Sequence, residues 1–138
     1  MIVTWTPTGL AAVVIGDDFG TAGGSSPGKV RTKLEQLGGM GEEQVVKLAF
    51  GANPFRAMRG NVAGDCVFTA RRSHADRQTA ANYFKTNYGY IGQQGTLLLT
   101  IDAASLTMAN ATFRGVIVAE FNGLEWTLRY TFGMTTIT

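Results

Sequence analysis

One segment of the chain comes close to a known chemical motif. Residues 23–29 have the Gly-x-x-x-x-Gly-Lys spacing of a phosphate-binding loop, in which backbone amides cradle phosphates and the lysine contacts them. The motif requires Ser or Thr at the next position to hold magnesium, but Val30 stands there. Pro27 also removes one amide donor, and the preceding apolar run ends as far upstream as Ile15. We therefore interpret the segment as a flexible loop, and an enzyme that uses it on a nucleotide is the third of three hypotheses.

The single histidine and the single cysteine lack the partners that catalysis needs. A histidine base requires a nucleophile and an orienting carboxylate nearby. His74 stands between Ser73 and Asp76, and a position at the start of a helix explains both neighbours. Cys66 lies in a run of alternating apolar residues, so it is interpreted as a small core residue, and one cysteine cannot form an internal disulfide.

Metal ligands and an exposed aromatic platform are not indicated either. The adjacent Asp17 and Asp18 lack the Asp-x-Asp-x-Asp-Gly pattern of a calcium loop and are interpreted as a solvated turn. Trp126 and Tyr130 share a face with Leu124 and Leu128, so we expect them in the core rather than on a surface that stacks nucleic-acid bases. The sequence therefore predicts no catalytic residue, no metal site, no cofactor, and a protein that is not an enzyme.

The composition indicates one globular domain with a lightly charged surface. Of the 138 residues, 45% are hydrophobic and only 16% are charged, below the usual quarter. A surface of this kind favours coverage by neighbouring subunits. The net charge of +2 does not by itself indicate a nucleic-acid or membrane partner. No apolar run reaches the roughly 18 residues of a membrane span, and the first residues do not resemble a secretory signal, so we expect a protein made in a cytoplasm.

The elements that hold these residues are mostly β-strands. Large apolar residues fall on every second position from 124 to 132, which places them on one face of an extended strand. Asn122 and Gly123 precede this strand and follow a β-branched run at 113–121, so the chain is expected to end in a hairpin with an Asn-Gly turn. The five residues of the apolar face are Leu124, Trp126, Leu128, Tyr130 and Phe132.

One helix interrupts the strands. It is predicted at 75–88, where Ser73 and Asp76 form a capping box and Gly89 is a natural stop. Its expected apolar stripe comprises Ala80, Phe84 and Tyr88. Further strands are expected at 1–5, 10–15, 44–50, 55–61, 65–71, 95–101 and 105–108.

Residues 16–41 are rich in glycine and are expected to form a long excursion, in which 29–37 is extended. No alternating strand–helix pattern of a parallel sheet is present. The predicted fold class is therefore mainly β: an antiparallel β-sandwich or barrel flanked by one α-helix, with a long Gly-rich loop near the N-terminus. Residues 1–138 are expected to form a single domain.

This order of elements resembles the tail-tube family, which covers tube, tube-end and hub proteins of phage tails and contractile injection systems. The segment from 55–61 through 72–76 is similar to that of small tail-associated proteins, and 124–132 resembles their closing strand. The resemblance implies a virion structural protein, assembled in the host cytoplasm into rings, commonly hexameric, that stack around a channel. It also implies that a long loop, here 16–41, reaches the neighbouring ring. The slightly basic charge differs from the acidic lumens that are common in that family.

The first hypothesis is therefore a self-assembling tail subunit whose strand edges and long loop gain order against copies of itself and other tail proteins. It has no membrane partner, and nucleic acid is met only by passage through a channel. The second hypothesis is a small monomeric β-barrel that binds a ligand or carbohydrate. The assembly contacts expected under the first hypothesis are Phe19, Lys29, Arg31, Lys33, Leu34, Tyr88 and Tyr90.

Overall fold

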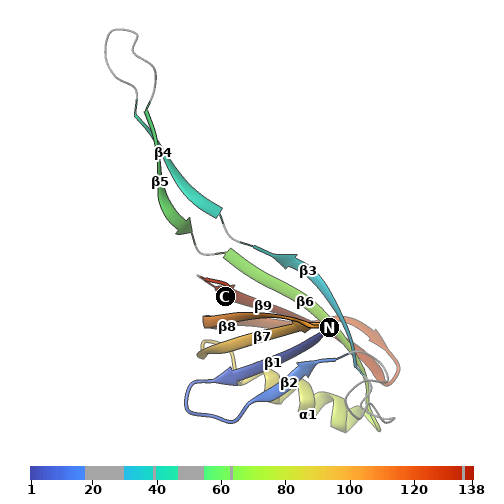
Figure 1. The fold of residues 1–138 in the computed structure, drawn as a ribbon. Helices are drawn as coiled ribbons and strands as arrows, with labels where there is room; N and C mark the ends of the chain where they lie inside the picture. Colours follow the sequence, from blue (N-terminus) through green and yellow to red (C-terminus); the bar gives the residue numbers. More distant parts are fainter. Residues whose placement is uncertain (18–29, 39, 47–54, 63, 135) are drawn as a thin grey trace.

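The fold is built around one large antiparallel sheet. The computed structural model describes residues 1–17, 30–38, 40–46, 55–62, 64–134 and 136–138. Seven strands form the sheet in the order β2-β1-β7-β8-β9-β6-β3, and the described residues contain one helix, α1 (Arg77–Tyr88) (Figure 1). The predicted mainly β fold class with one helix is confirmed. The strands of the sheet are β1 (Ile2–Pro7), β2 (Val13–Gly16), β3 (Val30–Leu37), β6 (Gly64–Ser73), β7 (Gln94–Ile101), β8 (Ala104–Asn122) and β9 (Glu125–Met134).

The sheet is not closed into a barrel, although its two edge strands approach each other at one corner. β2 and β3 are the edges, and the Thr32 hydroxyl donates a hydrogen bond of 3.0 Å to the Asp17 carbonyl oxygen. A Cβ atom at Gly16 would lie 2.6 Å from Thr32 Oγ1, so the glycine leaves room for this approach. The sheet is therefore curved, with an inner face and an outer face.

The inner face carries the hydrophobic core. The alternation predicted along β9 is confirmed for Leu128, Tyr130 and Phe132, which are all buried. The first two members of the same series behave differently: Leu124 is 42% exposed and Trp126 is half-buried. The buried apolar face therefore ends before the hairpin does.

Aromatic rings fill the centre of the inner face. The ring of Phe132 lies 5.0 Å from that of Trp5 and 4.8 Å from that of Phe113, in tilted and edge-to-face arrangements that aromatic pairs prefer. Cys66 is buried among them, as the sequence predicted. The buried core comprises Val3, Trp5, Ile15, Cys66, Phe68, Ala70, Leu97, Leu99, Met108, Ala111, Phe113, Val116, Leu128, Tyr130, Phe132 and Met134.

The β8–β9 hairpin differs from its prediction in two ways. β8 is one strand of 19 residues, whereas the sequence indicated separate strands at 105–108 and 113–121. The β7–β8 pairing changes register between Gly95 and Leu97, and the β8–β9 pairing changes register after Phe113 and after Val118. These shifts break the two-residue period of β8, so the sequence did not indicate one continuous strand. The loop itself is Gly123 and Leu124 rather than Asn122 and Gly123, because Asn122 still pairs with Glu125. Gly123 has φ +62°, which a type II′ turn requires at its first loop position.

The helix begins at a different cap from the one predicted. The Asp76 carboxylate accepts a hydrogen bond of 2.7 Å from the Thr79 backbone amide, which makes Asp76 the N-cap. Ser73 is still part of β6, and its hydroxyl donates to Glu125 at 3.2 Å. The capping box of Ser73 and Asp76 is therefore wrong, because sheet pairing takes Ser73 before the helix starts.

α1 packs on the inner face through residues three and four apart. Ala80 and Asn87 are buried, Phe84 is half-buried, and Tyr88, the last member of the predicted stripe, is 59% exposed. The Asn87 side-chain amide donates to the Tyr83 carbonyl oxygen at 2.8 Å, and its Oδ1 accepts from the Tyr130 hydroxyl at 3.2 Å. This buried pair of bonds ties the helix to β9.

A separate hairpin projects from the body. β4 (Met40–Val46) and β5 (Phe55–Val62) form a two-stranded sheet that Figure 1 shows standing away from the seven-stranded one. We call these two strands the arm. The strand predicted at 55–61 is confirmed, whereas the one predicted at 44–50 is found at 40–46, and 47–54 lie outside the described residues.

The segment 16–41 divides into several parts. Residues 30–37 form β3, which confirms the extended conformation expected for 29–37 from Val30 onward. Residues 18–29 and 39 lie outside the described residues. A single domain over the whole chain stays a prediction.

Candidate assembly surfaces

The outer face of the sheet is polar and rich in hydroxyl groups. The alternation that buries Phe68 and Ala70 turns Thr69 and Arg71 to the opposite side, and the same holds on the neighbouring strands. The outer face is therefore accessible to water or to another molecule. Its threonines are Thr4, Thr6, Thr69, Thr96, Thr100, Thr107, Thr112, Thr127 and Thr131.

Ion pairs join strands across this outer face. Arg71 Nε donates to Glu125 Oε2 at 3.0 Å, and this bond holds the pKa of the Glu125 carboxyl below its usual value. Arg129 Nε lies 3.0 Å from Glu35 Oε2, which bridges β9 to β3. Because these groups are substantially exposed, the pairs orient side chains more than they stabilise the fold.

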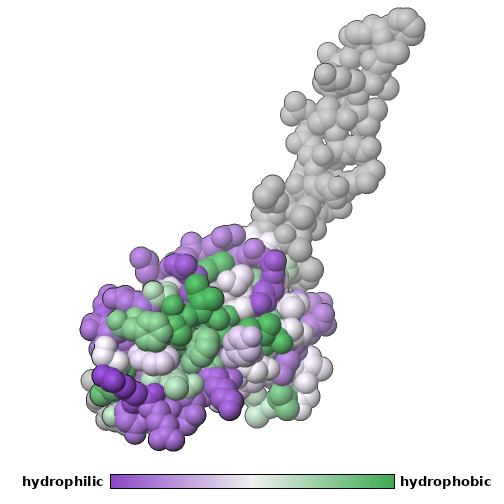
Figure 2. Space-filling model, turned by 180° about the vertical axis from the view of Figure 1, so that it is seen from behind, coloured by the Kyte–Doolittle hydropathy of each residue, from purple (hydrophilic) through white to green (hydrophobic). Residues whose placement is uncertain are grey.

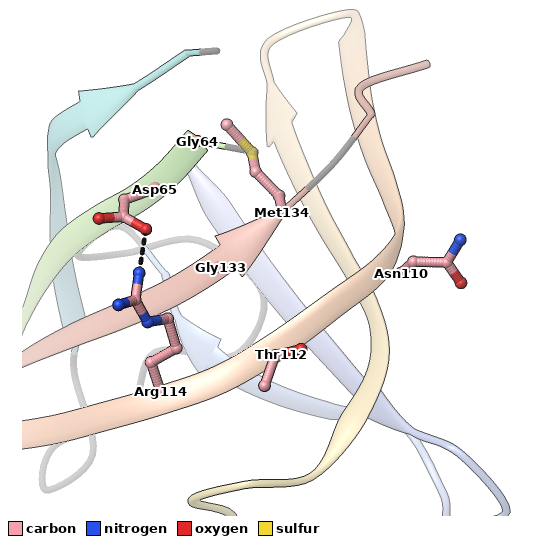
Figure 3. A pocket seen from close by; sticks show the side chains of 7 residues that line it. All are labelled: Gly64, Asp65, Asn110, Thr112, Arg114, Gly133 and Met134. Atoms are coloured by element: carbon pink, nitrogen blue, oxygen red, sulfur yellow. Dashed lines mark hydrogen bonds and ion pairs between the residues drawn. The ribbon is translucent and has the colours of Figure 1, made fainter. Parts of the chain in front are cut away.

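A hollow of about 340 Å³ surrounds a third ion pair, between Arg114 and Asp65 (Figure 3). Figure 3 shows the two side chains pointing toward each other from β8 and β6, with β9 between them. A Cβ atom at Gly133 would lie 3.0 Å from Arg114 Cδ, so the glycine makes room for the arginine stem. The two charges satisfy each other, and the hollow therefore does not present an uncompensated group to a ligand. Its lining residues are Gly64, Asp65, Asn110, Thr112, Arg114, Gly133 and Met134.

A second hollow, of about 330 Å³, lies at the β3 edge of the outer face. It is lined by two exposed cations of β3, Arg31 and Lys33, together with Arg71 and the hydroxyl-bearing Thr69 and Thr127. Of all the surfaces described, this one has the greatest excess of positive charge among its lining residues.

The predicted assembly contacts do not form one surface. Arg31 and Lys33 are exposed on β3, whereas Tyr88 is exposed at the end of α1, on the opposite side of the sheet. Leu34 and Tyr90 pack against the core. Phe19 and Lys29 lie outside the described residues. The contact role of these residues stays a prediction.

An apolar surface at the tip of the β8–β9 hairpin was missed by the sequence reasoning. Phe121 is 66% exposed, and its ring stacks edge-on against that of Trp126 at 4.8 Å. Leu124 lies between them in the chain, and Ile117 is 53% exposed on the outer face. Figure 2 shows apolar residues gathered on the side of the body seen from behind. We call Phe121, Leu124 and Trp126 the hairpin tip.

The lengths of the elements explain this tip, but the sequence carried no signal of them because it indicated two separate strands in place of β8. A helix of 12 residues is about 18 Å long, whereas a strand of 19 residues extends roughly 60 Å. One such helix cannot cover the whole inner side of β8. Alternation alone assigns the tip to the core face but does not say where the core ends.

His74 and Cys66 have structural surroundings. The His74 imidazole is buried, 5.4 Å from the Tyr83 ring, and its backbone amide donates to the Leu124 carbonyl oxygen at 3.0 Å. Burial and, less strongly, the nearby Arg72 lower the pKa of His74. Burial raises the pKa of the Cys66 thiol to about 12, so it stays protonated and is a poor nucleophile.

The motifs weighed for chemistry gain no support from the described residues. Within them, no three His, Cys, Asp or Glu side chains gather closely enough to hold a metal ion. The part of the chain that the structure describes has no helix that is both long and apolar enough to span a membrane. The glycine-rich motif at 23–29 lies outside the described residues.

Comparisons with known proteins give a structural similarity but no sequence match. No protein-family model matches the chain, and no curated protein sequence is significantly similar to it. Among solved structures, the chain is similar to one from the tail of an empty GTA (gene transfer agent) particle with C6 symmetry. The TM-score is 0.49 and the identity 11%, over 100% of this chain and 93% of the other.

Proposed function

We propose that this chain is a structural subunit of a phage tail or tail-like particle, which assembles with copies of itself into rings or a tube. The observation that carries the proposal is the arm together with two free sheet edges. β2 and β3 each have one strand neighbour, and β4 and β5 pair only with each other among the described strands. Unpaired edges present backbone donors and acceptors, and a lone two-stranded hairpin is marginally stable in water. Both features gain partners when another copy lies alongside.

The two ends of the body differ, which favours head-to-tail contacts. β6 begins beside the arm at Gly64 and ends at Ser73, which pairs with Glu125 next to the hairpin tip. A strand of ten residues spans about 30 Å, so the arm base and the apolar tip lie at opposite ends of the body. Contacts between unlike surfaces generate closed rings or open stacks rather than simple dimers.

The finer form of the assembly follows from the resemblance found in the sequence. Rings, commonly hexameric in the tail-tube family, are the expected form, and other tail proteins are the expected further partners. Arg31, Lys33 and Tyr88 are the proposed contacts that the structure places at the surface, and Phe19 and Lys29 remain proposed contacts. The protein is then a non-enzymatic component of a virion or virion-like particle.

The alternative of a ligand-binding β-barrel has less support from the packing. The space that a barrel would use for a ligand is the inner face, and Trp5, Phe113 and Phe132 fill it with all three side chains buried. The two hollows found among the described residues, each of about 330–340 Å³, are open and lie on the outer face rather than inside the sheet.

The test replaces residues 40–62 of the full chain with a short Gly-Ser linker. We expect the parent chain to form larger species as its concentration rises, seen by sedimentation velocity and electron microscopy. The armless chain should stay small while keeping the near-ultraviolet circular dichroism of its aromatic core. A matched control, Lys85→Gln on the exposed side of α1, should assemble like the parent.

Two results would count against the proposal. Rings or tubes of parental size from the armless chain would show that the arm is not an assembly element. A parent chain that remains monomeric across the concentration range would remove self-assembly itself.

A further inference from the structure

We propose that the hollow at the β3 edge of the outer face binds the phosphate groups of a nucleic-acid backbone through Arg31, Lys33 and Arg71. This proposal concerns a surface of the single chain and does not depend on ring or tube assembly. It assigns a ligand class to a surface for which the sequence gave only a contact role.

The local balance of charge around this hollow is positive. The other two cations on this part of the outer face form ion pairs: Arg71 is paired with Glu125, and Arg129 is paired with Glu35. Arg31 and Lys33 have no ion-pair partner among the described residues. Two cations without an ion-pair partner among the described residues, Arg31 and Lys33, therefore line the hollow beside the paired Arg71, and no carboxylate is among the lining residues. Glu120 stands opposite Thr127 in the β8–β9 ladder and is not a lining residue.

Arg31 also meets a like charge across the β3–β6 ladder, and the Glu125 carboxylate paired with Arg71 reduces this repulsion without removing the second cation. Arg31 is directly opposite Arg71 in the antiparallel β3–β6 ladder. Like charges at directly opposed positions destabilise a sheet. A structural role alone would favour an acidic or neutral residue at one of the two positions. An anion bound between the guanidinium groups would turn the repulsion into two favourable contacts.

The lining groups of the hollow also match the chemistry of phosphate. Guanidinium groups bind phosphate oxygens in a bidentate manner, and the hydroxyls of Thr69 and Thr127 add short donors among the lining residues. Arg31 and Lys33 are two residues apart on one strand, so their attachment points are about 6.6 Å apart along it. Two charges in a row along one strand suit a chain of phosphates better than one small anion.

The experiment measures binding of a fluorescein-labelled oligothymidylate to the full chain by fluorescence anisotropy over a range of salt concentrations. The variant is Arg31→Gln with Lys33→Gln. The matched control is Arg77→Gln with Lys85→Gln, which removes the same net charge from exposed positions on α1. Since a phosphate contact contributes about 0.7 to the salt slope for single strands, we expect the variant to lose about 1.4 from the slope. Its affinity should fall about tenfold or more, whereas the control keeps the parental values.

A second measurement keeps the test independent of folding defects. Arg31→Gln alone should melt at the same temperature as the parent or higher, because it removes the repulsion with Arg71. The oligonucleotide should raise the melting temperature of the parent and not that of the double variant.

Three outcomes would overturn the proposal. Equal losses in the variant and the control would show a general charge effect. No measurable binding by the parent at low salt would leave Arg31 and Lys33 as guards of an edge strand against aggregation. Inorganic phosphate that protects the parent as well as the oligonucleotide does would assign the hollow to a free anion instead.

Discussion

Gly95 stands where the backbones of β1 and β7 approach too closely for a side chain. A Cβ atom built there would lie 2.8 Å from Pro7 Cα and 2.9 Å from the Thr6 carbonyl carbon, and closer still to the Thr6 oxygen. Contacts under 3.0 Å with backbone atoms cannot be relieved by a rotamer change. The substitution Gly95→Ala must therefore push β1 away from β7.

The free-energy cost of moving β1 can be estimated from the packing and the hydrogen bonds of this strand. Overpacking of a tight site costs about 1–3 kcal/mol, and loss of a ladder hydrogen bond adds about 1 kcal/mol. β1 also places Val3 and Trp5 in the core, both fully buried, so a shift of the strand disturbs their packing. We expect Gly95→Ala to lower the free energy of unfolding by about 2–4 kcal/mol. For a chain of this size, that corresponds to a melting temperature lower by roughly 6–16 °C.

Gly115→Ala is the matched control for this measurement. Gly115 lies in β8 with φ outside the left-handed region, and a Cβ atom there would have no neighbour within 4 Å. Its substitution should change the free energy of unfolding by less than about 0.5 kcal/mol. Urea unfolding followed by tryptophan fluorescence measures both variants. Equal midpoints for the two would refute the claim that β1 and β7 are in contact at Gly95.

Three further predictions concern ionisable groups and the helix cap. Because burial raises the pKa of Cys66 to about 12, the thiol of the folded protein should react with a disulfide reagent about a thousandfold more slowly than that of the unfolded chain. The free energy of unfolding should also fall as the pH rises from about 9 toward 12, because only the unfolded chain then loses the thiol proton. Fast labelling of the folded protein at neutral pH would contradict this prediction. Because burial and Arg72 lower the pKa of His74 below its ordinary 6.5, the folded state favours neutral imidazole, so the urea midpoint should fall as pH drops from about 7 to about 5. In the variant His74→Gln the urea midpoint should depend less on pH over this range. An unchanged pH dependence would show that other ionisable groups cause it. Asp76→Ala should speed exchange of the Thr79 amide proton, measured by NMR, whereas Ser73→Ala should not; the reverse order would restore the cap expected from sequence.

Local periodicity predicted much of the fold because it depends on nearest neighbours in the chain. Side chains in a strand alternate between two faces, so the buried series Leu128, Tyr130 and Phe132 could be identified without knowing what covers it. The same reasoning located the single helix and identified Cys66 as a core residue. It failed for β8, where bulges change the phase of the alternation, and for the helix cap, where Ser73 is held by a neighbouring strand.

The candidate surfaces depend on which strands become neighbours, and this information is spread over distant parts of the sequence. Arg31 and Arg71 are 40 positions apart and meet only because β3 pairs with β6. Leu124 and Trp126 of the hairpin tip were assigned to the core face because their alternation continues that of the core, whereas the structure leaves Leu124 and the neighbouring Phe121 exposed. The arm was expected as two ordinary strands, since nothing in 40–46 or 55–62 shows that they leave the main sheet.

The amino-acid sequence by itself therefore determined the strand-rich class, the one helix, the face of each regular strand and the lack of an evident catalytic motif. These properties follow from side-chain types at short spacings, where the backbone geometry fixes which groups share a side. The tertiary structure alone decided that the sheet stays open, that β4 and β5 stand apart from it, and that Arg31, Lys33 and Arg71 line one hollow beside β3. Those features arise from long-range pairing, and pairing is set by the packing of the whole core rather than by any local run of residues.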